Sequence, residues 1–432
     1  MARKMKDSGI EWIGEIPEGW EIGQIGQLYS ERRTKVSDKD YPPLSVTMKG
    51  ILPQLSTAAK TDAHDDRKLV CKGDFAINSR SDRRGSCGIS EQDGSISLIN
   101  TVLQPRGEMN PGYYNWLFHT SMFADEFYKW GHGIVDDLWT TGWSDMKKIG
   151  VPVPSKCEQK QLAEHLNVEC SHIDSILSKT RASIEEYKKL KQAVITQAVT
   201  KGVRGEREMK DSGVEWIGRI PSEWYVAPFT KCLESTIDYR GKTPEKVSDG
   251  TFLVTAKNIK DGKLNYSASK EYVRTEQYED IMHRGKPEIG DVLFTTEAPL
   301  GEVCNVDRTD FALAQRIIKF RGIVGLVNNY YMKYWIMSSF FQNNLRTFAT
   351  GSTAQGIKAS KLGQLKLILP TLEEQQEIAD YLDAKCAEID KLIAKKEQLV
   401  KELESYKKSL IYEVVTGKRE IFTDITRKFP NI

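Results

Sequence analysis

The chain has 432 residues, enough for two or three domains, and with 39% hydrophobic and 28% charged residues it is neither collagen-like nor largely disordered. Its 62 Lys and Arg residues nearly cancel its 60 Asp and Glu residues, so the formal net charge is only +2 and a polyanion must bind local patches. No apolar run approaches the roughly 20 residues that a membrane-spanning helix requires.

The cysteines and the first residues both favour the cytoplasm. The chain has seven cysteines, an odd number, and no two are spaced as Cys-x-x-Cys, which argues against a disulfide framework and against a zinc or redox motif. The basic residues that follow Met1 precede no apolar segment, so we expect no secretory signal. We therefore expect a cytoplasmic protein with reduced thiols.

The sequence contains a duplication. Residues 5–20 and 209–224 are identical at 12 of 16 positions, and these two tags hold four of the nine tryptophans. From Pro154 and Pro370 onward the two copies match without a gap. Between these regions the similarity is weaker, and the aligned pairs are Arg32 with Arg240, Lys49 with Lys257, Asp74 with Asp291, and Tyr113-Tyr114 with Tyr330-Tyr331. Each copy therefore forms about half of the protein.

The first part of each copy has the pattern of a globular α+β domain. Short β-rich runs alternate with Gly, Pro and Asp turns, and one aromatic stretch in each copy has helical character. The expected boundaries are 1–153 for the first domain, 154–208 for a long helix with a linker, 209–369 for the second domain, and 370–432 for a second long helix with a tail.

Two long helices are predicted over residues 155–200 and 371–416. Both segments lack Gly and Pro, each begins with a capping box, at Ser155 and at Thr371, and a glycine follows each last turn. Apolar residues recur in heptads over four repeats, which is typical of a coiled coil. The predicted core comprises Leu166, Ile173, Leu177, Ile184, Leu382, Ile389, Ile393 and Val400.

A helix of this length cannot bury its apolar stripe alone, and its natural partner is the duplicate helix. If a pseudo-two-fold axis relates the copies, the two helices run antiparallel. Parallel packing is the competing geometry, but it requires a return crossing along the full helix. We therefore expect an α+β protein with two globular domains joined by an antiparallel coiled coil.

The sequence lacks the motifs of common catalytic and metal sites. Residues 240–243 resemble the end of a phosphate-binding loop, but Thr236 stands where that loop requires a glycine. No glycine-rich dinucleotide motif opens a helix, and the six histidines form no His-x-x-x-His pair. We therefore expect no catalytic residue, no metal and no cofactor in this chain, and a binding role instead.

The strongest binding candidate in the first domain is the loop that follows the strand after Gly73-Asp74. Arginine on such a loop is well suited to hydrogen-bond guanine O6 and N7, and serine suits phosphate. A solvated charged turn is an equally good interpretation. The candidates are Ser79, Arg80, Arg83, Arg84 and Ser86.

The second domain has a different loop at the equivalent place, with Thr295 and Thr296 as candidates. Glu297 could accept from cytosine N4, although a turn carboxylate is the simpler interpretation. Cations near matching positions of the two copies suit phosphate, which carries no sequence information, although structural salt bridges are the alternative for some of them. These further candidates are Arg32, Lys49, Arg240, Lys242, Lys257 and Lys358.

As a whole, the sequence resembles the specificity subunits of type I restriction–modification enzymes. The resemblance is carried by the Trp-Ile-Gly-x-Ile-Pro tags at residues 12–17 and 216–221 and by residues 238–244. It is also carried by residues 370–376 and 409–417, which open and close the second long helix. Weaker counterparts flank the first long helix. The first domain has residues 32–35 in place of residues 240–243, so the two copies match only approximately there.

The resemblance implies a non-catalytic DNA-binding subunit with two target recognition domains. Each domain would recognise one half of a bipartite double-stranded DNA target, and the helices would fix the spacer. The expected partners are two methyltransferase subunits and two restriction–translocase subunits. S-adenosylmethionine, ATP and Mg²⁺ are then expected in those partners, and base flipping would belong to the methyltransferase.

Two other interpretations remain open on the sequence. One is a stand-alone DNA-binding decoy or regulator with the same fold, which would need no partner subunit. The other is a coiled-coil scaffold whose two heads bind protein or glycan, which would have no affinity for DNA. An enzyme with a site formed by both heads is the weakest alternative, since no catalytic motif is present.

Overall fold

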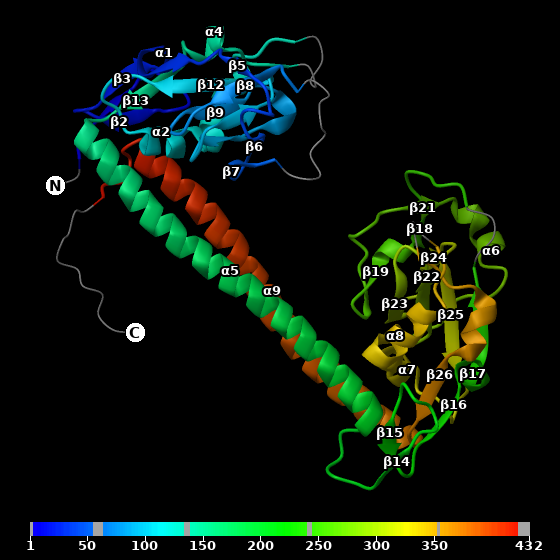
Figure 1. Ribbon diagram of the computed structural model, residues 1–432. Helices are drawn as coiled ribbons and strands as arrows, with labels where there is room; N and C mark the ends of the chain where they lie inside the picture. The colour runs from blue at the N-terminus through cyan, green and yellow to red at the C-terminus, as the bar shows by residue number, and fades with distance from the viewer. Residues whose placement is uncertain (1–2, 55–63, 134–138, 240–243, 352–354, 422–432) are drawn as a thin grey trace. The chain divides into compact units, whose positions relative to one another are not determined.

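The computed structural model describes residues 3–54, 64–133, 139–239, 244–351 and 355–421 (Figure 1). The chain forms two compact units, one made of Met1–Thr180 with Gln398–Ile432 and the other of Arg181–Glu397. They are called here the first and the second unit, and the part of each outside the long helices is called its head. Both units contain a segment of each long helix, so α5 and α9 both pass from one unit to the other.

The long helices are α5 (Lys156–Lys201) and α9 (Leu372–Val415), which confirms the predicted segments to within one residue at each end. Each helix begins where a hydroxyl accepts a backbone N–H in its first turn: Ser155 Oγ from Glu158 and Thr371 Oγ1 from Glu374, both at 3.3 Å. Each is followed by a glycine at positive φ, which ends the helix without steric cost.

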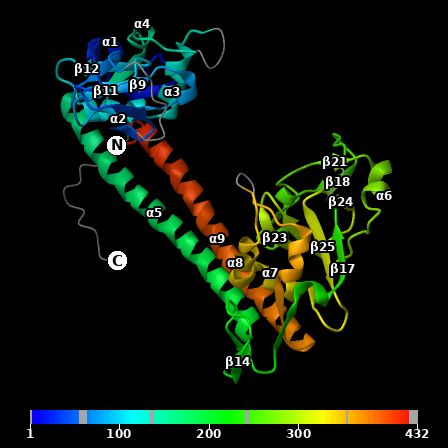
Figure 2. The ribbon, with the colours of Figure 1, turned by 45° about the vertical axis from the view of Figure 1, so that its right-hand side comes forward.

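Within each unit the two helix segments run antiparallel, as Figures 1 and 2 show. An ion pair between Asp174 and Lys407 joins them in the first unit at 2.6 Å, and one between Lys191 and Asp390 does so in the second, also at 2.6 Å. Lys191 lies 17 residues after Asp174, and Asp390 lies 17 residues before Lys407. Both units therefore use the same antiparallel register.

The heptad positions lie between the two helices. Six of the eight predicted core residues are buried, and Ile393 and Val400 are half-buried. In the first unit Leu166, Ile173 and Leu177 belong to the same apolar cluster as Leu410 of α9 and the aromatic residues of the head. The coiled-coil seam is thus continuous with the core of the head on which it ends.

The first head contains a four-stranded antiparallel sheet in the order β10-β9-β12-β4 and a three-stranded sheet in the order β11-β8-β5. Its strands are β1 (Met5–Asp7), β2 (Glu15–Pro17), β3 (Glu21–Gln24), β4 (Tyr29–Glu31), β5 (Lys35–Val36), β6 (Leu44–Thr47), β7 (Gly50–Pro53), β8 (Arg67–Val70), β9 (Phe75–Asn78), β10 (Cys87–Ile89), β11 (Gly94–Ile96), β12 (Asn100–Pro105) and β13 (Gly150–Val153). Its helices are α1 (Ile25–Leu28), η1 (Ser81–Arg83), α2 (Pro111–Phe118), α3 (Ser121–Lys129) and α4 (Trp143–Met146).

The second head repeats the four-stranded antiparallel sheet, in the order β17-β25-β22-β23, and has a three-stranded sheet in the order β21-β18-β24 in which β18 and β24 run parallel. Its strands are β14 (Met209–Asp211), β15 (Arg219–Pro221), β16 (Tyr225–Pro228), β17 (Leu233–Asp238), β18 (Thr251–Val254), β19 (Ile259–Lys260), β20 (Lys263–Leu264), β21 (Tyr272–Val273), β22 (Val292–Thr296), β23 (Leu300–Asn305), β24 (Phe311–Leu313), β25 (Ile317–Gly322) and β26 (Lys366–Leu369). Its helices are η3 (Phe229–Cys232), η4 (Ala256–Asn258), η5 (Thr275–Gln277), α6 (Tyr278–Ile281), α7 (Asn329–Met337), α8 (Ser339–Thr347) and η6 (Ala359–Gln364). Both heads are α+β, as predicted.

The strand register corrects one of the sequence alignments. Glu31 pairs with Leu103 in the first head, and Thr236 pairs with Phe320 at the equivalent place in the second. Glu31 and Thr236 are therefore equivalent, and the residues that follow them, Arg32 and Ile237, are equivalent too. The alignment of Arg32 with Arg240 is therefore wrong, because the weak similarity between the copies cannot define the register there.

A second alignment is wrong by one residue. An asparagine caps each of the equivalent helices α2 and α7, Asn110 in the first head and Asn328 in the second. The third residue after each cap, Tyr113 or Tyr331, is fully buried, whereas Tyr330 is 40% exposed. Tyr113 therefore corresponds to Tyr331. Two adjacent tyrosines in both copies had concealed this shift.

The burial pattern of α9 predicts a sharp difference between two of its leucines. Leu382 is fully buried in the core of the second unit, so Leu382→Ala should lower the free energy of unfolding by about 2–5 kcal/mol. Leu392 on the same helix is 36% exposed, and Leu392→Ala should cost less than about 0.5 kcal/mol. Urea unfolding followed by circular dichroism measures both, and equal effects would contradict the heptad assignment.

Candidate nucleic-acid interface

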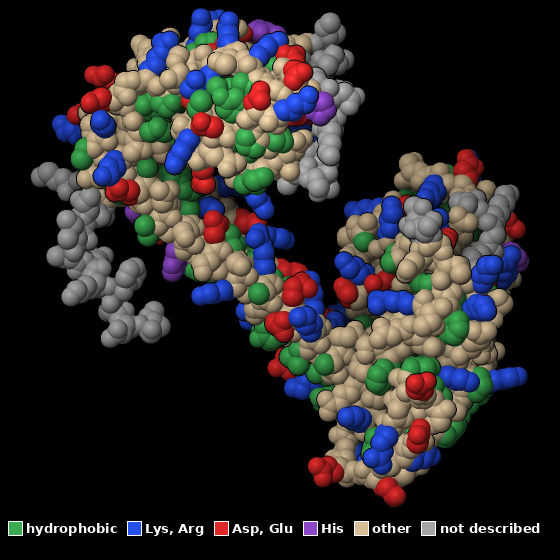
Figure 3. All heavy atoms as spheres, in the orientation of Figure 1, with side chains coloured by type: hydrophobic (Ala, Val, Ile, Leu, Met, Phe, Trp, Pro, Cys, Tyr) green, Lys and Arg blue, Asp and Glu red, His purple; other side chains and the backbone are tan. Residues whose placement is uncertain are grey.

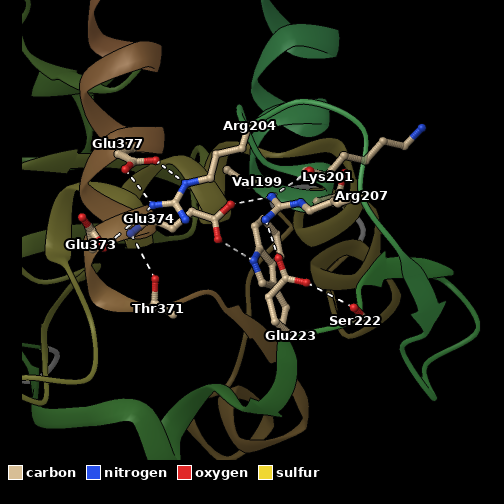
Figure 4. A network of polar contacts seen from close by, with 12 residues as sticks. Val199, Lys201, Arg204, Arg207, Ser222, Glu223, Thr371, Glu373, Glu374 and Glu377 are labelled. Carbon is tan, nitrogen blue, oxygen red and sulfur yellow. Dashed lines mark hydrogen bonds and ion pairs between the residues drawn. The ribbon is translucent and has the colours of Figure 1, made fainter.

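Each head is attached to the start of a long helix by a tryptophan, a glutamate and an arginine. In the second unit the indole N–H of Trp224 donates to Glu374 at 2.8 Å, and Arg207 binds the same carboxylate while its guanidinium lies over the indole (Figure 4). In the first unit Trp20 and Arg3 bind Glu158 in the same way, at 2.9 Å and 2.6 Å. The repeated tags thus fix the heads on the helices.

Buried hydrogen bonds also connect each head to the end of the other helix. The hydroxyl of Tyr113 donates to the carbonyl of Val415 at 2.6 Å in the first unit. In the second unit Tyr331 donates to the carbonyls of Ile368, at 3.0 Å, and Val199, at 3.4 Å. Burial raises the pKa of both hydroxyls, which remain donors at neutral pH. Each head therefore contacts both long helices.

The aspartate of each Gly-Asp pair anchors the central strand that leads to the predicted binding loop. Asp74 accepts from the Nε of Arg32 at 2.6 Å and from the backbone N–H of Cys71 at 2.9 Å. Asp291 is 1% exposed and accepts from Arg321 at 2.7 Å and from Lys319 at 3.1 Å. Arg32, a phosphate candidate on the sequence, is therefore engaged in a structural ion pair.

Burial alone would raise the pKa of the Asp291 carboxyl. The hydrogen bonds from Arg321, from the backbone N–H of Glu288 and from Lys319 outweigh burial, so that the pKa lies below its ordinary value. Asp291 is therefore ionised at neutral pH and compensates the charge of Lys319, whose side chain is 2% exposed. This arrangement is a rigid base for the strand rather than a reactive site.

The predicted loop of the first head follows β9, and its residues differ in what they can contact. Arg80 and Arg83 are exposed, and Arg83 lies 3.6 Å from its neighbour Asp82. Arg84 is held by Asp125 at 3.0 Å and lies over the ring of Tyr128.

The two serines of this loop have structural contacts. Ser79 is half-buried and shares a hydrogen bond of 2.9 Å with Thr101. Ser86 is buried. Of the five candidates, Arg80 and Arg83 therefore present the freest guanidinium groups.

The candidates in the second head are mostly buried. Thr295 and Thr296 are at most 1% exposed, and their hydroxyls bond to the backbone of Glu302 and Arg316. In this conformation neither threonine can touch DNA, which overturns their assignment as contacts. They lie within β22, whose last residues the sequence pattern assigned to the loop.

The remaining cationic candidates are dispersed. Lys49 lies between β6 and β7, Lys257 lies in η4, and Lys358 precedes η6, and all three are exposed. Arg240 and Lys242 lie outside the described residues. Figure 3 shows Lys and Arg side chains interspersed with Asp and Glu over the visible faces, in keeping with the net charge of +2. No broad field of one sign is present on these faces.

The sequence did not select the residues that flank the tip of β22 as candidates, although Glu297 was considered as a contact to cytosine. Glu297 follows this strand directly, and its carboxylate forms an ion pair with Arg316, whose Nε lies 2.8 Å away. Its seven-residue spacing from Gly290 equals that of Arg80 from Gly73, and this signal could have marked the position. Arg316 precedes β25 and no sequence signal marks it.

Among the described residues, no group of three or more His, Cys, Asp or Glu side chains is placed to hold a metal ion. No helix in the described ranges is both long enough and apolar enough to cross a membrane.

The charge compensation at Asp291 predicts a measurable loss of stability. Asp291→Asn leaves Lys319 buried without its counter-ion and should cost about 3–5 kcal/mol at pH 7. Asp74→Asn is the matched control in the first unit and should cost less, because the side chain of Arg32 is 20% exposed. Urea unfolding at pH 7 compares the two, and equal costs would contradict the role of burial.

The same carboxylate makes stability depend on pH in a defined direction. Its folded-state pKa is lowered, so its contribution is complete above the unfolded-state pKa of about 3.9 and is lost as the pH falls through the folded-state value. The difference in unfolding free energy between wild type and Asp291→Asn should therefore narrow in acid. A difference that widens as the pH falls would contradict this assignment.

Comparisons with known proteins find similarity to specificity subunits of type I restriction enzymes. A family model described as the type I restriction modification DNA specificity domain matches residues 240–402. The type I restriction enzyme MjaVIII specificity subunit of Methanocaldococcus jannaschii is 24% identical over 427 residues, which cover 93% of each chain. The EcoKI specificity subunit of Escherichia coli K12 is 26% identical over 222 residues, which cover 46% of this chain and 44% of that one.

Solved structures share the fold. A chain from a study of complex assembly and conformational transition of the type I R-M system matches with a TM-score of 0.70 and 13% identity, covering 94% of this chain and 99% of that chain. The HsdS subunit from Thermoanaerobacter tengcongensis matches with a TM-score of 0.51 and 14% identity, covering 94% and 98%. With its two tagged heads and its pair of long helices, the chain is similar over almost its whole length to specificity subunits of type I restriction–modification systems.

Proposed function

We propose that this chain gives a type I restriction–modification complex its DNA specificity, with each head recognising one half of a bipartite target and the long helices fixing the spacer between the halves. The observation that carries the proposal is the combination of two equivalent heads, fixed on the helices by equivalent contacts, with different residues at the tips of their central strands. Two heads with the same scaffold but different residues at their strand tips are suited to bind two different half-sites.

The tips supply the chemistry that recognition of bases requires. Arg80 extends from the end of β9 into solvent, and a guanidinium can donate two hydrogen bonds to guanine O6 and N7 in the major groove. Exposed lysines such as Lys49 and Lys257 suit the phosphate backbone, which positions a protein without specifying sequence. Recognition and anchoring thus fall to different residues.

Catalysis is assigned to the partner subunits. The chain has no recognisable catalytic motif, and a methyltransferase subunit would bring S-adenosylmethionine while a restriction–translocase subunit would bring ATP and Mg²⁺. The duplication offers one equivalent docking face per copy, as two identical methyltransferase subunits require. Because the net charge of this chain is only +2, the partner subunits would supply part of the positive charge that contacts the DNA phosphates.

Co-expression with the methyltransferase gene of the same system tests the proposal. Single-molecule sequencing of the host DNA should then detect N6-methyladenine in both halves of one split motif. A stable complex that methylates no new motif would favour a decoy. A purified chain that binds DNA neither alone nor with the methyltransferase would favour a scaffold with other ligands.

The exposed arginines of the first head make a prediction specific to one half-site. Arg80→Ala should relax recognition at one position of one half, at a cost of about 1–3 kcal/mol, and leave the other half unchanged. Arg84→Ala is the matched control, because Asp125 and Tyr128 already hold that guanidinium. Competition binding of the methyltransferase complex with singly substituted duplexes measures both. An unchanged motif in Arg80→Ala and Arg83→Ala would remove this loop from the interface.

The helix register allows a matched test of the spacer. Residues 181–187 of α5 face residues 394–400 of α9 in the register of the two ion pairs, so removing both heptads preserves each pair. At 1.5 Å per residue this shortens the helix pair by about 10 Å, or about three base pairs of DNA.

The methylated motif of the doubly deleted protein should therefore have a spacer about three base pairs shorter. Deleting only one of the two heptads breaks the register and should abolish assembly, which size-exclusion chromatography detects. An unchanged spacer in an active, doubly deleted complex would exclude the helices as the ruler.

A further inference from the structure

We propose that Arg316 recognises a guanine in the half-site bound by the second head, and that Glu297 is the positioning residue that orients its guanidinium. The inference rests on the proposed function and names the recognition residues of one head. It is carried by three observations: the place of Glu297 in the duplicated fold, the geometry of the ion pair, and the backbone conformation of Arg316.

Glu297 occupies the position in the second head that Arg80 occupies in the first. Phe75 of β9 and Val292 of β22 are equivalent in the two sheets, and each tip residue follows five positions later. Each tip also forms an isolated antiparallel bridge to a later loop, Arg80 with Thr140 and Glu297 with Gly356. The duplicated fold therefore presents opposite charges at one equivalent point.

Arg316 occupies a second equivalent position beside this tip. The backbone N–H of Thr296 donates to the carbonyl of Arg316 at 2.8 Å, as that of Ser79 donates to Ile99 at 3.2 Å in the first head. A partly exposed isoleucine is thus replaced by an exposed arginine. The second head thus carries its guanidinium on the residue before the adjacent strand β25, whereas the first head carries it on the tip residue.

The geometry of the ion pair leaves the recognition edge of the arginine free. Nε of Arg316 lies 2.8 Å from Oε1 of Glu297 in an ion pair, and the side chains of Glu297 and Arg316 are 41% and 47% exposed. The two terminal Nη groups remain available to donate to two acceptors on one base edge, and guanine O6 and N7 form such a pair. The backbone of Gly356 lies close beside Glu297, where an added Cβ would be 3.2 Å from the Cβ of Glu297.

The backbone at this point is held in an unfavourable conformation. Arg316 has a φ of +82°, and Ala298, which follows Glu297, has a φ of +46°. Residues other than Gly and Asn rarely adopt this left-handed backbone region. Thr296 fixes Arg316 through both its N–H and its hydroxyl, which donates to the same carbonyl at 3.2 Å. An exposed ion pair stabilises a fold only slightly, so stability does not account for an arginine where glycine fits better.

The test uses the complex of this chain with its methyltransferase subunit and duplexes in which each base pair of the methylated motif is replaced in turn. Arg316→Ala should lower discrimination at a single G·C pair of one half by about 10- to 100-fold and leave every position of the other half unchanged. Arg316→Lys should lose most of the same discrimination, since an ammonium group lacks the two parallel N–H donors of a guanidinium.

Two further substitutions separate recognition from structure. Arg316→Gly should raise the thermal unfolding midpoint, because glycine accepts positive φ, yet lose the same discrimination as Arg316→Ala. Glu297→Gln should retain most discrimination, since an amide oxygen at the same place can accept a hydrogen bond from the guanidinium, whereas Glu297→Ala should lose it. Asp261→Gly, at another non-glycine residue with positive φ in this head, is the control and should change no base preference.

Several results would overturn the inference. If Arg316→Ala leaves every position of the motif unchanged, Arg316 recognises no base. If it weakens binding equally to all duplexes and lowers the salt dependence, Arg316 contacts phosphate instead. If the wild-type complex methylates no split motif at all, the proposed function falls together with this inference, whereas an intact motif with unchanged discrimination overturns the inference alone.

Discussion

The contact between a tryptophan, a glutamate and an arginine at the start of each long helix is the constraint on which the rest of the structure depends. Glu374 is 1% exposed, so its charge must be compensated, and Arg207 and the indole N–H of Trp224 do this from the head. The first turn of a helix also favours a carboxylate. The head is thereby fixed where the helix begins, and a base-reading residue on it can keep a defined distance along that helix.

Most of the scaffold could be predicted from the sequence because its signals are local or repeated. The caps and heptads determine α5 and α9 to within one residue, since a long helix repeats its pattern many times. The repeated tags revealed the duplication, but they did not reveal which contacts their tryptophans make. Trp20 and Trp224 find their glutamates 138 and 150 residues away, and no local pattern encodes that pairing.

The candidate interface was less accessible to prediction. The last hydrogen-bonded pair of a strand decides which of its final side chains face solvent. A shift of one residue in this position moves each side chain to the opposite face of the sheet. Thr295 and Thr296 were placed outside β22 but are buried within it, while Glu297 begins the exposed tip. Arg316 directly precedes β25 and is brought to this tip only by the pairing of β22 with β25.

The two anchoring aspartates show why such a scaffold can change its specificity. Asp74 and Asp291 hold equivalent strands, but the cation of the first is the residue after β4 and those of the second come from β25. The fold requires a compensated carboxylate there and not a particular partner. The tips lie several residues beyond these anchors, where neither head buries its Arg80 or Glu297. Residues at the tips can therefore be exchanged at little cost in stability, which is the property that a pair of separately evolving recognition surfaces needs.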